Sequence, residues 1–241
     1  MSLSNDLKKF ILSKGAKQVG FADLNDMGVS NINGEDLGFK VKSGICFLIN
    51  LDANIVKTLV DGPSLEYYNH YSKINDELDS IGKDVEAFLK SKNYNAYAQT
   101  FDRTCNDFIF NNGCDNTIPH KTVGTKAGLG WIGKCDAFIT NEFGSALRLS
   151  TVLTDAPLEY AHPVTASLCG MCTECRNICP GGAVSGITWS PRLKREDFFD
   201  YEKCMEAAKK QCREVLGRED TICGRCIAAC PHTQKYLRKV L

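Results

Sequence analysis

The sequence carries two cysteine motifs close together in its last third. The first reads C-G-M-C-T-E-C-R-N-I-C-P from Cys169 to Pro180. It matches the C-x-x-C-x-x-C-x-x-x-C-P run of bacterial ferredoxins, in which the fourth cysteine binds the other of two clusters. The second motif reads C-G-R-C-I-A-A-C-P from Cys223 to Pro231 and is one cysteine short of the full run. The pair of motifs predicts two [4Fe–4S] clusters.

The crossed ligand pattern of two-cluster ferredoxins assigns the cysteines to two sets. We expect the first cluster to be bound by Cys169, Cys172, Cys175 and Cys230. We expect the second cluster to be bound by Cys179, Cys223, Cys226 and one of Cys204 or Cys212, which lie between the motifs.

A pair of zinc sites is the alternative, because C-x-x-C pairs also bind zinc. A zinc site needs four ligands. It requires neither a C-x-x-C-x-x-C triplet nor a proline after the last cysteine. The motifs therefore favour iron–sulfur clusters over zinc.

Four further cysteines are scattered over residues 1–168. Cys46 lies in an apolar run and is predicted to pack in the core as a small hydrophobic residue. Cys105, Cys114 and Cys135 lie in loop-like sequence, and we interpret them as structural or incidental thiols. The first fifteen residues predict an amphipathic helix capped by Ser4, without the features of a secretory signal. We therefore expect a cytoplasmic protein without a membrane-spanning segment, whose cysteines are reduced.

Charge gives no reason to expect a nucleic-acid-binding protein. Lys and Arg total 29, and Asp and Glu also total 29. A balanced chain has no overall field that would attract a polyanion.

The apolar pattern predicts an α+β layered domain over residues 1–168, followed by a cysteine-rich domain over residues 169–241. Buried strands are expected at residues 18–24, 45–51 and 95–100, and a long helix at residues 65–89. Residues 137–140 and 146–153 flank turn-forming residues and predict a hairpin.

Residues 119–134 read P-H-K-T-V-G-T-K-A-G-L-G-W-I-G-K. This segment, residues 144–145 and 149–155, both cysteine motifs and the ending C-P-H-T-Q-K-Y of residues 230–236 resemble the epoxyqueuosine reductase family. That family is related to the corrinoid-dependent reductive dehalogenases. The resemblance extends more weakly to residues 19–21, covers nearly the whole chain, and marks it as a short form without the C-terminal helical-repeat extension.

The resemblance implies a nitroreductase-like layered α/β domain that binds cobalamin, followed by a ferredoxin-like module with two [4Fe–4S] clusters. The residues expected at the corrinoid are His120, Gly128, Gly130, Trp131, Gly133 and Lys134. Glycines there would let the backbone approach the corrin, because they have no Cβ. An ordinary turn with Trp131 in the core is the alternative for this stretch.

The family pattern also bears on three further positions of this chain. The family supplies an acid upstream of the glycine-rich turn, and Asp115 is the candidate catalytic acid in this chain. The family usually has Asn after the Gly-Lys pair, where this chain has Cys135. The family also places a cysteine early between the two motifs, which favours Cys204 over Cys212 as the eighth ligand.

The implied function is a cobalamin-dependent iron–sulfur reductase. Its electrons would come from a reduced ferredoxin or flavodoxin, and its substrate would be a small molecule or a modified nucleoside. Transfer RNA is not expected as a partner, because the charge is balanced and the extension is missing. The alternative is a non-enzymatic dicluster electron-transfer protein without a corrinoid, and a third reading is a flavin-dependent reductase.

Overall fold

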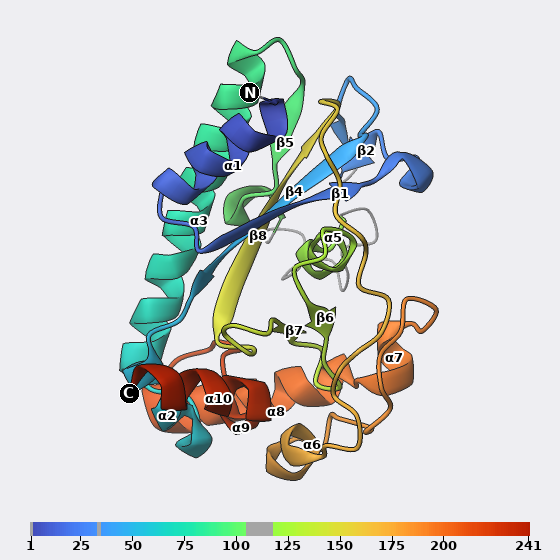
Figure 1. The fold of residues 1–241 in the computed structure, drawn as a ribbon. Coiled ribbons are helices and arrows are strands. Elements are labelled where there is room, and N and C mark those ends of the chain that lie inside the picture. The colour runs from blue at the N-terminus through green and yellow to red at the C-terminus, as the bar shows by residue number, and fades with distance from the viewer. Residues whose placement is uncertain (1, 33–34, 105–117) are drawn as a thin grey trace. The chain divides into compact units, whose positions relative to one another are not determined.

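The computed structural model describes residues 2–32, 35–104 and 118–241 (Figure 1). The chain forms two compact units that alternate along the sequence. The first unit comprises Met1–Ile49, Ile74–Leu129 and Arg148–Val164. The second comprises Asn50–Lys73, Gly130–Leu147 and Thr165–Leu241. The predicted domain boundary after residue 168 lies close to the last of these crossings, between residues 164 and 165.

The first unit is built on a four-stranded sheet in the order β1-β4-β8-β5. The strands are β1 (Gln18–Asp23), β4 (Ser43–Asn50), β8 (Leu147–Thr154) and β5 (Ala96–Ala98). Strands β1 and β4 are antiparallel, with Gly20 opposite Cys46, and β5 is antiparallel to β8. Most residues of β4 and β8 are buried, which explains the apolar run of β4. Strand β8 also buries the polar residues Ser150, Thr151 and Thr154.

Helices cover both faces of this sheet. Helix α1 (Leu3–Ser13) and the part of α3 (Leu65–Ser91) that belongs to this unit lie on one face, where Phe10 stacks on Phe88 at 4.8 Å. Helix α5 (His120–Lys126) lies on the other face (Figure 1), and Val123 packs there in a core with Leu24 and Cys46. The burial of Cys46 in this core confirms its predicted packing role. The mixed α/β architecture and the long helix are likewise confirmed.

Two local predictions are wrong. The N-cap of α1 is Ser2, whose side chain accepts a hydrogen bond from the Asn5 backbone N–H, whereas Ser4 is buried and accepts from Glu159. The predicted hairpin between residues 137–140 and 146–153 is reduced to one bridge, between Thr140 and Gly144. Strand β7 (Phe138–Ile139) pairs instead with β6 (Trp131–Ile132), while β8 pairs in the large sheet. Long-range pairing of a largely buried strand outweighs pairing with its sequence neighbour.

The second unit is made of short helices around the β6–β7 hairpin. Its helices are α2 (Ala53–Thr58), η2 (Leu59–Asp61), α6 (Glu174–Ile178), α7 (Arg195–Phe198), α8 (Tyr201–Leu216), α9 (Arg225–Ala229) and α10 (Pro231–Val240). Helices α6 and α9 pack against each other, and α10 packs on α9 and α2. Short elements η1 (Asn25–Met27), β2 (Asn31–Ile32) and β3 (Glu35–Asp36) complete the first unit. None of the described helices combines the length and apolar character needed to cross a bilayer.

Candidate iron–sulfur site

The two cysteine motifs adopt the same local structure. In each, a one-turn helix carries a cysteine as its second residue, Cys175 in α6 and Cys226 in α9, three positions after Cys172 and Cys223. Gly170, in the first motif, and Gly224, the N-cap of α9, have positive φ (48° and 85°), which a glycine adopts without steric cost.

The last cysteine of each motif ends its helix. Cys179 and Cys230 have extended backbones (ψ 115° and 126°), and each precedes a proline. A residue before proline is driven out of the α region, so the chain must leave the helix at this cysteine. The proline therefore directs the last thiol of each motif away from the cysteines that precede it.

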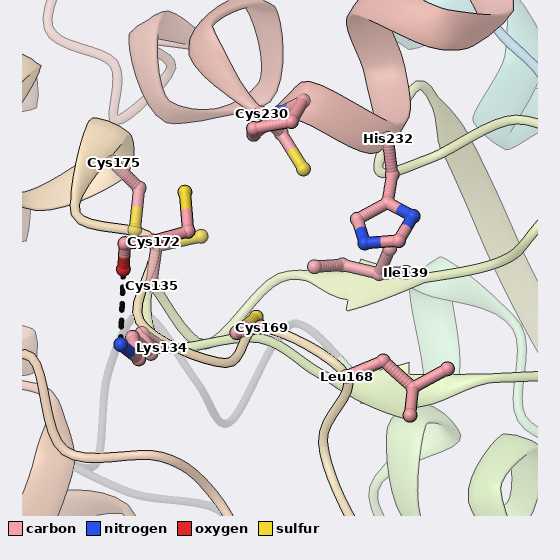
Figure 2. Close-up of a pocket in the computed structure, with 10 residues that line it drawn as sticks. Lys134, Cys135, Ile139, Leu168, Cys169, Cys172, Cys175, Cys230 and His232 are labelled. Atoms are coloured by element: carbon pink, nitrogen blue, oxygen red, sulfur yellow. Dashed lines mark hydrogen bonds between the residues drawn. The ribbon is translucent and has the colours of Figure 1, made fainter.

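A cavity of about 170 Å³ lies within the second unit beside the first motif. The cysteines that line it are Cys135, Cys169, Cys172, Cys175 and Cys230. Figure 2 shows their sulfur atoms around a common space, with His232 and Lys134 at its edge. Engineered apolar cavities of about 150 Å³ hold a benzene-sized molecule, so this cavity has room for a compact inorganic group. Four of these cysteines are the predicted first ligand set, including Cys230 from the second motif.

Hydrogen-bond donors point at several of the sulfur atoms. The Ala183 backbone N–H donates to Cys179 Sγ at 3.4 Å, and the Gln211 side-chain amide donates to Cys223 Sγ at 3.3 Å. Burial raises the pKa of the Cys230 thiol, while backbone N–H groups of Thr233 and His232, at the start of α10, oppose that rise. Such donors stabilise negative charge on sulfur, as a thiolate ligand requires.

Cys204 and Cys212 occupy different environments on α8. Cys204 is half-buried in the first turn, and burial together with the neighbouring Cys179, Cys223 and Asp136 raises the pKa of its thiol to about 11. The fully buried Cys212 donates to the Ile222 carbonyl at 3.0 Å. Cys204 is thus grouped with two members of the predicted second ligand set, whereas the Cys212 thiol is already engaged with the backbone.

The sulfur atoms of the described cysteines line a cavity and do not meet at a single point. No group of three or more His, Cys, Asp or Glu side chains within the described ranges is close enough to hold a single metal ion. A mononuclear zinc site needs four ligands within bonding distance of one ion. A cluster of four irons separates its ligands more widely than a single ion does.

Cys135 is the site residue that our reading of the sequence missed. It was interpreted as an incidental thiol, but it is buried and lines the cavity together with four predicted ligands. Its neighbour Lys134, also buried, donates from Nζ to the Cys172 carbonyl oxygen at 2.9 Å (Figure 2). The only sequence signal was the replacement of the family's Asn at position 135, because spacing alone does not connect residue 135 with residue 169.

The predicted corrinoid residues fall in both units. In the first unit, His120 Nδ1 lies 2.8 Å from Thr151 Oγ1, and burial together with the positive charges of Arg148 and Lys121 lowers its pKa to about 4. A Cβ on Gly128 would lie 2.9 Å from the His162 carbonyl oxygen. The candidate acid Asp115 falls in 105–117, outside the described residues.

In the second unit, the glycines are needed by the hairpin itself. A Cβ on Gly130 would collide with the Ile139 carbonyl oxygen, and a Cβ on Gly133 would lie 2.6 Å from Ile139 Cδ1. The space that each missing Cβ leaves is therefore filled by the chain's own atoms. Packing within the hairpin is thus sufficient to explain these two glycines, and their expected role at a corrinoid stays a prediction.

Trp131 combines a core position with an available donor. Its ring is 2% exposed and packs edge-on against His232 at 4.9 Å. Its indole N–H is buried and has no hydrogen-bond partner among the described residues. The core reading of Trp131 is confirmed, and its indole N–H is a donor that a bound group could use.

The fold defines a class shared by two kinds of reductase. A catabolic reductive dehalogenase matches 96% of this chain with a TM-score of 0.65 at 18% identity, and the match covers 32% of that protein. An epoxyqueuosine reductase solved with an epoxyqueuosine-modified tRNA stem loop matches 96% of this chain with a TM-score of 0.60 at 20% identity, over 65% of its own length. These likenesses establish the fold.

Curated relatives confirm the resemblance to the epoxyqueuosine reductases. The Salmonella typhimurium enzyme of that name is 32% identical over 182 residues, and the Escherichia coli enzyme is 28% identical over 171 residues. These matches cover 75% and 70% of this chain but only 44% and 42% of the relatives, so the chain spans less than half of their length. No protein-family model matches the chain. The expectation that tRNA is no partner finds no support here, since one structural neighbour was solved with a tRNA stem loop.

Proposed function

We propose that this protein is an iron–sulfur oxidoreductase of the epoxyqueuosine reductase type, which passes electrons through two [4Fe–4S] clusters. The observation that carries the proposal is the gathering of Cys169, Cys172, Cys175 and Cys230 around one cavity. Three come from the first motif and one from the second, as the crossed ligand pattern requires. Named reductases among the curated relatives support the reaction class.

The second cluster in this proposal is held by Cys179, Cys204, Cys223 and Cys226. The proximity of Cys204 to Cys179 and Cys223 supports this set, as do the N–H donors at Cys179 and Cys223. Reduction potentials of such clusters depend on hydrogen bonds to sulfur and on burial. The proposed module is ferredoxin-like, and a reduced ferredoxin or flavodoxin is the proposed electron donor.

The substrate in this proposal is a small molecule or a modified nucleoside, and Asp115 is the proposed proton donor. Cobalamin, when bound, would supply a cobalt centre that a cluster can reduce. The resemblance supports this cofactor, and so does a neighbouring reductive dehalogenase whose structure is described as suggesting a B12-dependent mechanism. The filled space at Gly128, Gly130 and Gly133 argues against these glycines as its binding site, and we assign no step to it.

That same observation favours one second candidate, a dicluster electron-transfer protein without a corrinoid. It needs only the cysteine site and a docking partner. It accounts for the glycine-rich stretch as a structural hairpin.

Anaerobic reconstitution followed by iron and sulfide analysis and a cobalamin titration tests both candidates. Two clusters require about eight irons and eight sulfides per chain. Stoichiometric zinc without visible charge-transfer absorption would refute the cluster proposal. Full clusters with spectral changes on cobalamin addition support the reductase, whereas full clusters without them support the electron carrier.

A further inference from the structure

Cys135 lies at an unusual place for a buried thiol. It is in the loop of the β6–β7 hairpin, which is closed by hydrogen bonds between Gly133 and Ala137 (2.8 Å) and between Asp136 and Gly133 (3.0 Å). Hairpin loops usually face solvent, yet Cys135 is only 7% exposed. The loop thus inserts its central thiol into the second unit.

The thiol meets one cysteine from each motif. The neighbouring Cys175 lowers the pKa of Cys135, but the neighbouring Cys226 and burial outweigh that effect and raise this pKa well above its ordinary value. The geometry agrees, because Cys175 and Cys226 are the second residues of α6 and α9, which pack against each other. Figure 2 shows Cys135 beside Cys175 and Cys172 on one wall of the cavity. Cys135 therefore lies between the two predicted ligand sets.

With Cys135, the two predicted ligand sets have one more cysteine near them than two clusters can bind. Two [4Fe–4S] clusters take eight cysteines, and the two sets already contain eight without Cys135. A ninth thiol at the boundary remains an S–H group, which is a weak hydrogen-bond donor and acceptor. Hydrogen bonds to ligand sulfur are among the factors that set cluster potentials.

We propose that Cys135 is a positioning residue that links the two clusters, donating its S–H to a ligand sulfur and raising the reduction potential of the cluster that receives it. The inference rests on the proposed function, because it requires both clusters. The inference assigns a role to Cys135, which occupies the position where the epoxyqueuosine reductase family usually has Asn. A donor at this point stabilises the added negative charge of the reduced cluster more than that of the oxidised cluster.

The test compares Cys135→Ala and Cys135→Ser in the full chain after anaerobic reconstitution. Iron analysis counts the clusters, and a redox titration followed by electron paramagnetic resonance measures both potentials. We expect both variants to keep about eight irons. Cys135→Ala should shift at least one potential to a more negative value because the donor is lost. Cys135→Ser should shift it to a more positive value, because a hydroxyl is a stronger donor than a thiol.

Cys46→Ala is the matched control, since Cys46 is a fully buried thiol in the first unit's sheet core. Both of its potentials should equal those of the unsubstituted protein. Unchanged potentials in both Cys135 variants, at full iron content, would overturn the inference. Loss of half the iron on either substitution would also overturn it, because Cys135 would then be a ligand. An unsubstituted protein without two clusters would instead refute the proposed function.

Discussion

The ammonium group of Lys134 donates a hydrogen bond to the carbonyl oxygen of Cys172 at 2.9 Å (Figure 2). Lys134 is 5% exposed, and no ion pair joins it to a carboxylate in the described part of the chain. A buried cation without a partner charge is costly to hold. A cluster ligated by four thiolates is anionic, so the proposed first cluster would supply the missing charge.

Lys134→Met should therefore lower the reduction potential of the first cluster, because the nearby positive charge that favours the reduced state is removed. Methionine keeps most of the aliphatic volume, so iron content should be retained. The measurement is a redox titration of the reconstituted protein. Lys126→Met, which removes a surface ion pair with Asp26, is the control and should leave the potential unchanged. A potential that stays constant in the Lys134 variant would contradict this role.

Serine replacements at the two intervening cysteines should have different effects. Cys204→Ser should leave about four irons per chain, since a ligand of the second cluster is lost. Cys212→Ser should leave about eight, because the Cys212 thiol contacts the Ile222 carbonyl. Iron and sulfide analysis checks both. The opposite pattern would transfer the ligand role to Cys212.

The partly buried His120 predicts a pH dependence of stability. Its pKa is lowered from 6.5 in the unfolded chain to about 4 in the folded one. Between these values the unfolded state binds more protons, so the free energy of unfolding should fall as the pH drops from about 6.5 towards 4. The loss attributable to His120 is at most on the order of 3 kcal/mol.

Urea denaturation across this pH range measures the effect. His120→Gln should show a flatter pH profile than the unsubstituted protein. His162→Gln, at an exposed position, should keep the original profile. Parallel profiles for His120→Gln and the unsubstituted protein would show that His120 accepts its proton freely when folded.

Glu86 should be a strong stabilising residue of the first unit. Its carboxylate accepts hydrogen bonds from the Ala98 backbone N–H (2.8 Å), Arg103 (2.8 Å) and Lys90 (2.6 Å). Burial alone would raise the pKa of Glu86, but these donors outweigh it and lower the pKa. Glu86→Ala should cost about 2–4 kcal/mol of unfolding free energy, because the buried Ala98 N–H loses its acceptor and Arg103 loses its partner charge.

Lys90→Ala provides the comparison, because the Lys90 side chain is 58% exposed. Its loss should cost no more than about 1 kcal/mol. Denaturant titration at neutral pH measures both. Equal costs for the two substitutions would show that the buried hydrogen bonds of Glu86 add little.

The sequence predicted local structure and the cysteine motifs, but it did not predict which distant strands and side chains come together. The strands around residues 18–23 and 43–50, the helix from residue 65, and the two cysteine motifs follow from apolar runs, periodicity and spacing. In each case the determining interactions lie within a few residues. The same holds for the turn-and-helix form of each motif, which glycine and proline impose on their own neighbours.

Tertiary structure decided which distant groups meet. The largely buried strand β8 pairs in the four-stranded sheet and leaves β7 to pair with β6, because burying this strand between two neighbours outweighs pairing along the chain. The hairpin loop places Cys135 beside Cys175 and Cys226, which follow it by 40 and 91 positions. Gly130 and Gly133 were read as a cofactor surface, yet they are required by Ile139 across the hairpin. Residue type and spacing determine which thiols can bind a cluster, but only packing determines which of the remaining groups lie against them.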